Sequence, residues 1–261
     1  MRCSSAHPRH GFTLIELLVV VGLIALLIAL VLSVVGGVRD QAQLLECQSN
    51  QHQLQVGLYG YSMEHGGRFI SPRTAPIGNL PTVLLWVRSY NGEGSVRINT
   101  NGTENVTALH EGALWEYVGD EAIYSSPLDP TGRLRSYSIN GFVSDLPDNS
   151  SNPEHAWGPV ADRISKIMNP ATTLLSIPED DHQPFNLHGF VLEVYNDLWI
   201  DYPIDWFEQG KTTVGFVDGS TKTIHYANPT LLADIGEHWA SVNAATQDDW
   251  NVFEEFIRID R

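Results

Sequence analysis

A single carboxylate, that of Glu16, stands at the start of a long apolar segment. The nineteen residues from Leu17 to Val35 are all strongly apolar except Gly22 and Ser33. A charged carboxylate beside lipid is costly unless another group pairs with it. We therefore interpret Glu16 as a functional residue and look for its partner.

The residues just ahead of Glu16 have the order of a processing site. Gly11 precedes the aromatic residue Phe12, and Glu16 is the fifth residue after this glycine. The run Gly-Phe-Thr-Leu-Ile-Glu resembles the prepilin cleavage site of type IV pilins and type II secretion pseudopilins. The resemblance implies that prepilin peptidase cuts after Gly11 and methylates the amine of Phe12. Glu16 would then pair with this amine in a neighbouring subunit. A plain signal anchor is the alternative, but it leaves the glutamate unexplained.

The apolar segment is long enough to cross a membrane. Nineteen helical residues cover roughly 28 Å, close to the thickness of a bilayer's hydrocarbon core. The leader carries Arg2 and Arg9 and no acid, a bias that holds it in the cytoplasm. We expect a single-pass protein of a bacterial inner membrane, with that membrane's lipid as a partner. Its C-terminal domain would be extracytoplasmic, in the periplasm or in a surface filament.

The helical pattern continues beyond the membrane segment. One apolar stripe follows steps of three and four residues, with Gln51 in its gap, and Gly66-Gly67 should end the helix. The members of the stripe are Leu44, Cys47, Leu54, Leu58 and Tyr61. We therefore divide the chain into a leader (1–11), a transmembrane helix (12–38), its extracytoplasmic continuation (39–65) and a β-rich globular domain (66–261).

The composition limits the class of partner. A formal net charge of -16 makes nucleic acid an unsuitable ligand, because phosphate binding needs a basic face. The two cysteines are Cys3 and Cys47, so cleavage after Gly11 leaves no pair for an internal disulfide. We expect Cys47 to be a packed, unreactive side chain.

The segment from Cys47 to the helix end, and patches of the chain up to about Ser220, resemble a large bacterial subgroup of prepilin-like proteins, whose signature is a His, nine residues and Asp-Gly. The shared positions beyond the helix are Leu114, Tyr117, Tyr124, Pro127, Asp129, Ser136, Tyr137 and Asn140. The chain departs from the subgroup at Ser126, where cysteine is usual, and at Glu208, where the histidine is expected. A disulfide known in relatives, or a role of that histidine, is therefore not carried over. Taken together, the resemblances imply an α+β, pilin-like fold, with a long N-terminal helix packed on an antiparallel sheet.

We predict that Asp218 and Gly219 form a structural turn. They separate two alternating segments within residues 212–226, and a two-residue Asp-Gly loop favours a type I′ turn. Elsewhere we expect a short helix over 112–118, a tight turn over 127–130 and strands over 135–142 and 172–177. The C-terminal part should form two helices. The apolar stripe of the first is Leu231, Leu232, Ile235 and Trp239, and Thr246 and Asp249 are a capping pair for the second.

Two groups of side chains suggest ligands. Asp180 and Asp181 lie in the densest acidic stretch, and with Asp218 they are the candidates for calcium, although EF-hand spacing is missing. Acidic loops are most often only solvated, so no cofactor is expected. The aromatic segment 191–210 could bind a sugar, but core packing is the commoner role of such residues.

The search for catalytic motifs finds none that is complete. His110-Glu111 begins like a zinc-protease motif, but Leu114 stands where the second histidine is needed. We therefore expect a non-enzymatic subunit of a pilus or pseudopilus, with prepilin peptidase and other pilin or pseudopilin subunits as partners. A membrane-tethered binding module, with carbohydrate as one ligand class, and a tethered hydrolase are the alternatives.

Overall fold

The computed structural model describes residues 12–74, 84–88, 106–130, 132–145, 156–180, 188–204, 210–235 and 239–260. The chain forms two compact units, Met1–Gln43 and Leu44–Arg261. The helix α1, Leu14–Glu64, begins in the first unit and ends in the second. The boundary between the two units therefore lies inside this helix, a few residues after the end of the membrane segment expected from the sequence.

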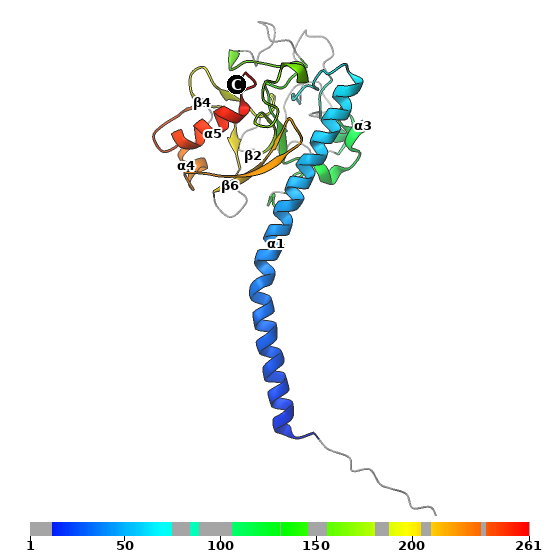
Figure 1. Ribbon diagram of the computed structural model, residues 1–261, viewed down its shortest axis with the longest axis vertical. Helices are drawn as coiled ribbons and strands as arrows, with labels where there is room; N and C mark the ends of the chain where they lie inside the picture. The colour runs from blue at the N-terminus through cyan, green and yellow to red at the C-terminus, as the bar shows by residue number, and fades with distance from the viewer. Residues whose placement is uncertain are drawn as a thin grey trace, which may run out of the picture. The chain divides into compact units, whose positions relative to one another are not determined.

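The second unit combines short helices with antiparallel strands (Figure 1). Its helices after α1 are α2 (Thr107–His110), α3 (Trp115–Val118), the 3-10 helices η1 (Glu121–Tyr124) and η3 (Ile164–Lys166), α4 (Leu231–Ile235) and α5 (Gln247–Ile257). Its strands are β1 (Tyr137–Ile139), β2 (Leu174–Asp180), β3 (Leu192–Glu193), β4 (Leu198–Trp199), β5 (Tyr202–Pro203), β6 (Lys211–Phe216), β7 (Thr221–His225) and β8 (Ala240–Ser241).

The strands form two antiparallel sheets. The larger sheet has the order β1-β2-β6-β7, with β5 paired to β2, and the smaller has the order β3-β4-β8. All the strand pairs are antiparallel. The prediction of an α+β architecture with a long N-terminal apolar helix is confirmed.

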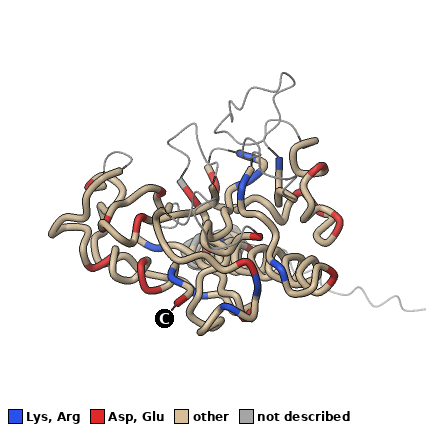
Figure 2. The backbone as a smooth tube through the Cα atoms, turned by 90° about the horizontal axis from the view of Figure 1, so that it is seen from above, with Lys and Arg blue, Asp and Glu red and all other residues tan. Residues whose placement is uncertain are grey.

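Acidic side chains are spread over the loops and helix ends of the second unit, as the backbone view in Figure 2 shows. Several of them are paired locally, for example Asp162 with Lys166 (2.6 Å) and Glu254 with Arg258 (3.0 Å). Both pairs join residues four apart in sequence and do not tie distant segments together, so packing has to hold this unit together.

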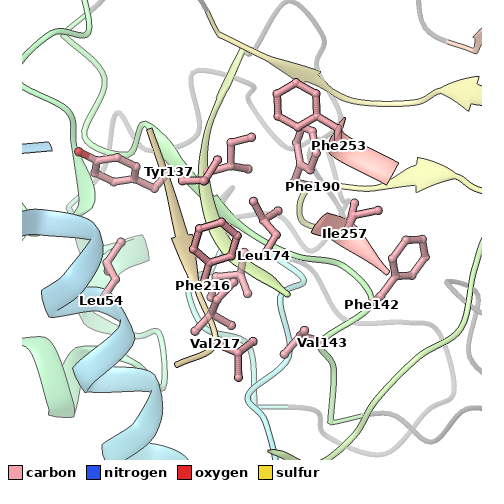
Figure 3. Packing of buried hydrophobic residues seen from close by; sticks show 14 of the residues in the cluster. Leu54, Tyr137, Phe142, Val143, Leu174, Phe190, Phe216, Val217, Phe253 and Ile257 are labelled. Atoms are coloured by element: carbon pink, nitrogen blue, oxygen red, sulfur yellow. The ribbon is translucent and has the colours of Figure 1, made fainter. Parts of the chain in front are cut away.

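The face of the larger sheet that meets α5 is apolar. Phe216 of β6 packs edge-on against Phe256 of α5, with ring centroids 5.3 Å apart. Trp199, on β4 of the smaller sheet, packs against the same helix, with its ring centroid 5.1 Å from that of Trp250 and 6.0 Å from that of Phe253, and all three are buried. Figure 3 shows Phe190, Phe253 and Ile257 gathered in this layer. Removing such a ring costs about 3–5 kcal/mol, so this layer contributes strongly to folding.

The opposite face of the sheet meets α1 through polar groups as well as apolar ones. Of the predicted stripe, Leu44 is half-buried, and the other four residues are buried: Cys47, Leu54, Leu58 and Tyr61. Between them lies Gln51, which is fully buried and donates from Nε2 to the carbonyl of Thr213 on β6 (3.1 Å). A Cβ at Gly215 would overlap the carboxamide of Gln55, so glycine lets the helix approach the strand.

Glycines end α1 as predicted. The helix stops at Glu64, and Gly66 and Gly67 have φ values of 65° and 81°. The N–H of Gly67 donates back to the carbonyl of Ser62 (2.8 Å), which satisfies one of the last helical carbonyls.

Several elements are shorter than the sequence predicts. The expected helix over 112–118 is only Trp115–Val118, because Gly112 and Ala113 instead hold the chain against residues 85–86. The expected strand over 135–142 is only Tyr137–Ile139. The turn expected over 127–130 lies one residue earlier, with the Asp129 N–H donating to the carbonyl of Ser126 (3.0 Å).

Two predictions for the C-terminal part are wrong. Thr246 does not cap α5 with its side chain, and Asp249 is buried, accepting from the backbone N–H groups of Ala227 (2.7 Å) and Asn228 (2.9 Å). Trp239 does not continue the stripe of α4, since it lies outside that helix with a φ of 60° and is half-exposed. Both errors arise because local spacing says nothing of contacts with distant segments.

Candidate functional site

The start of α1 is a capping box. The N–H of Thr13 donates to Glu16 Oε2 (2.9 Å), and the Thr13 hydroxyl donates to the same oxygen (2.7 Å). In return, the N–H of Glu16 donates to Thr13 Oγ1 (3.3 Å). This reciprocal pair satisfies two of the backbone donors that every helix N-terminus leaves free.

The capping box gives Glu16 a partner that the sequence reading overlooked. Thr13 is the N-cap residue and Glu16 is the third helical residue, the spacing of the S/T-x-x-E pattern. This spacing is present in the sequence itself, so the capping box could have been predicted from Thr13 and Glu16. The carboxylate therefore has hydrogen-bond donors within its own helix before any subunit arrives.

The two predicted processing residues, Gly11 and Phe12, directly precede this capping box. Phe12 is described and its side chain is exposed, whereas Gly11 lies outside the described residues. The structure therefore does not describe the backbone at the predicted cleavage point. What the structure shows is that the exposed Phe12 directly precedes the N-cap.

The described apolar side chains of α1 that precede the second unit are exposed to the surroundings. They include the apolar side chains from Leu14 to Leu32, and in the described part of the chain α1 is the one helix long and apolar enough to cross a membrane. So large an apolar surface is stable only in lipid or against another protein. A helix suits lipid because it satisfies its backbone groups internally.

The Asp218–Gly219 hairpin is present, but the predicted type I′ turn is wrong. The Gly219 N–H donates to the carbonyl of Phe216 (3.0 Å), and the Phe216 N–H donates to the carbonyl of Ser220 (2.8 Å). The loop therefore has three residues, Val217 to Gly219. Gly219 has a φ of 91°, and among the described non-glycine residues only Asp197 and Trp239 have positive φ. This is a type I turn followed by a left-handed glycine, in which Asp218 needs no positive φ.

The hairpin turn contacts α1. His52 Nδ1 lies 2.8 Å from the carbonyl oxygen of Gly219, and Gln55 Nε2 donates to the carbonyl of Ser220 (3.4 Å). The hydroxyl of Tyr59 donates to the carbonyl of Val217. The turn thus anchors the helix to the sheet through three of its carbonyl groups.

Of the three calcium candidates, only Asp218 has a described side chain. Oδ1 of Asp218 accepts from the N–H (2.9 Å) and the hydroxyl (2.6 Å) of Ser220, inside the turn. Asp180 ends β2, and both its side chain and Asp181 lie outside what is described. In the described residues, no three metal-capable side chains are grouped. Nothing here therefore supports calcium binding.

Cys47 is buried and lies next to Ser126. Its Sγ lies 2.8 Å from Oγ of Ser126, the position at which relatives are expected to have cysteine. Burial raises the pKa of the Cys47 thiol, so the thiol is the favoured form and the side chain is a poor nucleophile. The structure places the two residues next to each other although 79 positions separate them.

The aromatic segment expected to be core or a sugar-binding face is partly core where it is described, and its Tyr195 is exposed. Trp199 and Tyr202 are buried. Trp206, Phe207 and Glu208 lie outside the described residues. No sugar-binding face is therefore assigned to this segment.

The N-terminal segment matches a known motif. Residues 7–32 match the model of the prokaryotic N-terminal methylation motif, and the match spans Gly11, Phe12 and Glu16. No curated protein and no solved structure matches the chain. The match confirms the prediction of a prepilin-type N-terminus, while the resemblance of the rest of the chain to the His-and-Asp-Gly subgroup stays a prediction.

Proposed function

We propose that this chain, which carries a prepilin-type N-terminal methylation motif, is a structural subunit of a type II secretion pseudopilus or a type IV pilus-like filament. Prepilin peptidase removes residues 1–11 and methylates Phe12. Before assembly, the subunit lies in the inner membrane with its N-terminus on the cytoplasmic side and its C-terminal unit outside. It then assembles with other pilin-like subunits, a structural rather than a catalytic role.

The motif and the apolar part of α1 support the first steps of this proposal. The motif implies processing by prepilin peptidase, and the helix suits membrane anchoring. The exposed position of Phe12 beside the N-cap leaves its amine accessible after cleavage. In the capping box, Glu16 Oε2 is already engaged, and the second carboxylate oxygen can accept from the amine of a neighbouring subunit.

The observation that carries the assembly step is an apolar stripe on the part of α1 inside the second unit. Leu45, Val56 and Met63 are 56%, 56% and 78% exposed. They are spaced by 11 and 7 residues, about three and two helical turns, and therefore lie above one another. The residues that pack on the sheet are on the other side of the helix: Cys47, Leu54, Leu58 and Tyr61.

The side chains of this outer stripe, Leu45, Val56 and Met63, are exposed. Single exposed apolar residues are ordinary, but three in register along one helix are the pattern by which helices pack side by side. Between subunits, such packing also supplies the shape matching that lipid cannot, because lipid is as apolar as leucine. We assign the outer stripe to contacts with neighbouring subunits.

The first test concerns cleavage after Gly11 and methylation of Phe12. In the source bacterium, mass spectrometry of the natural protein should find a chain that starts with N-methylated Phe12. A Gly11→Val chain should stay full-length, because the bulkier side chain does not fit a peptidase that accepts glycine. A Gly11→Val chain that still begins at Phe12 would contradict the cleavage assignment.

The assembly arm uses the outer stripe. A Val56→Gln, Met63→Gln double variant should be processed and inserted normally yet reduce filament yield at least about tenfold, counted by electron microscopy. The matched control is Glu46→Gln, an exposed position of the same helix outside the stripe, which should assemble normally. Normal filaments from the double variant would exclude the outer stripe as the assembly surface.

A further inference from the structure

A pocket of about 240 Å³ lies in the second unit, where three segments meet. The end of α1 contributes Tyr61 and His65, residues 84–88 contribute Arg88, and residues 110–117 contribute the remaining wall. It involves neither the processing residues nor the outer stripe of α1. Its function is therefore separate from that of the N-terminal segment.

The backbone of the wall is held firmly. The N–H of Ala113 donates to the carbonyl of Leu85 (2.9 Å), and that of Arg88 donates to the carbonyl of Ala108 (2.9 Å). Gly112 lies so close to Trp86 that a Cβ there would overlap the Trp86 backbone. The two segments are therefore locked together before any ligand binds.

Glycine also brings α3 close to α1. A Cβ at Gly60 would lie 2.9 Å from Tyr117 Cδ1, and one at Gly57 would lie 2.7 Å from Val118 Cγ2. This approach places the Tyr117 ring edge-on to Tyr61, with centroids 5.9 Å apart, and lets the Tyr117 hydroxyl donate to Glu64 Oε2 (2.7 Å). The position of Tyr117 in the wall is thus fixed by packing and by a hydrogen bond.

The pocket presents aromatic rings beside polar groups of both kinds. The exposed His65 ring stacks on Tyr61 at 3.9 Å, with an interplanar angle of 11°. Arg88 offers only donors, whereas Glu111 and Glu116 offer only acceptors. Arg88 Nη1 and Glu111 Oε2 are 3.8 Å apart, and both side chains are about half-exposed, so they can turn toward a ligand.

These groups favour a neutral, hydroxyl-rich ring. An anion would meet the carboxylates of Glu111 and Glu116, and a cation would meet the guanidinium of Arg88. A hydroxyl donates to a carboxylate and accepts from a guanidinium, so several hydroxyls on one ring satisfy both. The apolar face of a sugar ring packs on aromatic side chains, here His65 and Tyr117. A volume below the roughly 300 Å³ of drug-sized sites suits one such ring.

We propose that this pocket binds a single neutral sugar unit, with Tyr117 and His65 as the stacking surface and Arg88, Glu111 and Glu116 as its hydroxyl partners. The site does not depend on filament assembly. A subunit that fails to assemble would still bind, and a subunit that assembles would carry the site with it.

Saturation-transfer NMR on the full-length chain tests the proposal. The chain is held in micelles of a detergent without a sugar headgroup. The probes are methyl β-D-glucopyranoside, methyl β-D-galactopyranoside and N-acetylglucosamine, with acetate and tetramethylammonium as ionic probes. At least one sugar should show saturation transfer at millimolar concentration, above that seen with empty micelles, and the ionic probes should show none.

Variants identify the site. Tyr117→Ala should weaken sugar binding at least about fivefold, whereas Tyr117→Phe, which keeps the ring, should bind like the natural chain. Glu116→Gln, at an exposed position that leaves packing intact, should also weaken binding. Tyr195→Ala removes an exposed tyrosine far along the chain and should change nothing.

The proposal is overturned by any of three results. The first is that no sugar gives a signal. The second is that the sugars bind equally to the natural chain, Tyr117→Ala and Glu116→Gln. The third is that acetate or tetramethylammonium gives the stronger signal, which would show an ion site.

Discussion

At the scale of single residues, the structure changes the interpretation of Glu16. A carboxylate next to an apolar run needs donors, and Thr13 supplies two of them within the same helix turn. Glu16 can therefore enter the membrane already hydrogen-bonded and still keep acceptor capacity for a second subunit. The residue that makes this possible, Thr13, belongs to the site as much as Glu16 does.

The side chain at position 126 decides whether Cys47 can form a disulfide. The oxygen of Ser126 lies 2.8 Å from the sulfur of Cys47, so a cysteine at 126 would place two sulfurs side by side. We predict that Ser126→Cys, made with Cys3→Ser, forms a disulfide on oxidation. Closing a loop across 79 positions should stabilise the second unit by about 4 kcal/mol.

The measurement is the melting temperature with and without reductant, with mass spectrometry for the loss of two hydrogens. Cys47→Ala in the same background is the control and should show no effect of reductant. If the double cysteine chain keeps two free thiols after oxidation, the side chains cannot reach the geometry of a disulfide.

At the scale of elements, the hairpin between β6 and β7 anchors α1. Its three carbonyl groups contact His52, Gln55 and Tyr59 of the helix. Asp-Gly is therefore a structural pair: Gly219 supplies the left-handed backbone, and the Asp218 carboxylate closes the turn onto Ser220.

Substitutions in this turn should have unequal effects. Gly219→Val forces a β-branched residue to a φ of 91° and should destabilise the second unit by about 1–3 kcal/mol. Asp218→Asn should be nearly silent, within about 0.5 kcal/mol, because the amide oxygen can accept the same two hydrogen bonds. Both changes are measured by thermal unfolding of the full chain.

Thermal unfolding of the same two chains, repeated with calcium, tests whether Asp218 is a structural turn residue or a metal ligand. Natural chain and Asp218→Asn should melt alike in either condition. A calcium-dependent rise in melting temperature that Asp218→Asn abolishes would make Asp218 a ligand.

At the scale of the whole molecule, two tyrosines near the end of α1 limit stability at alkaline pH. The pKa of Tyr61 is raised to about 12, first by burial and then by the charge of Asp145. The pKa of Tyr117 is also raised to about 12, first by desolvation and then by its hydrogen bond to Glu64. In the unfolded chain, both would ionise near their ordinary value of about 10.

Because these pKa values are higher in the folded state, the stability they contribute is complete below about pH 10 and is lost as the pH rises through about 12. Melting temperature should therefore fall over this window. In the Tyr61→Phe, Tyr117→Phe double variant, the fall should be shallower, since neither ring can ionise. Absorbance at 295 nm follows ionisation during the same titration, and identical pH curves for both chains would contradict the assignment.

The sequence by itself determined the features that depend on local pattern. An apolar run of sufficient length predicts a membrane helix, and the Gly11-Phe12 step with Glu16 predicts a processing site, because a peptidase reads only a few neighbouring residues. Gly66-Gly67 predicts a helix end, since only backbone conformation is involved. The buried stripe of α1 follows from a helical period that each turn repeats.

Only the tertiary structure decided which distant residues meet. Asp249 looks like a helix cap in sequence, but it holds the backbone of residues 227–228. Cys47 meets Ser126, and His65 meets Arg88 and Glu116 in one pocket, because the sheet and α3 fold back onto α1. The turn at Gly219 has three residues rather than two because the pairing of β6 with β7 sets its length. Each outcome depends on packing between segments far apart in the chain, which local spacing does not encode.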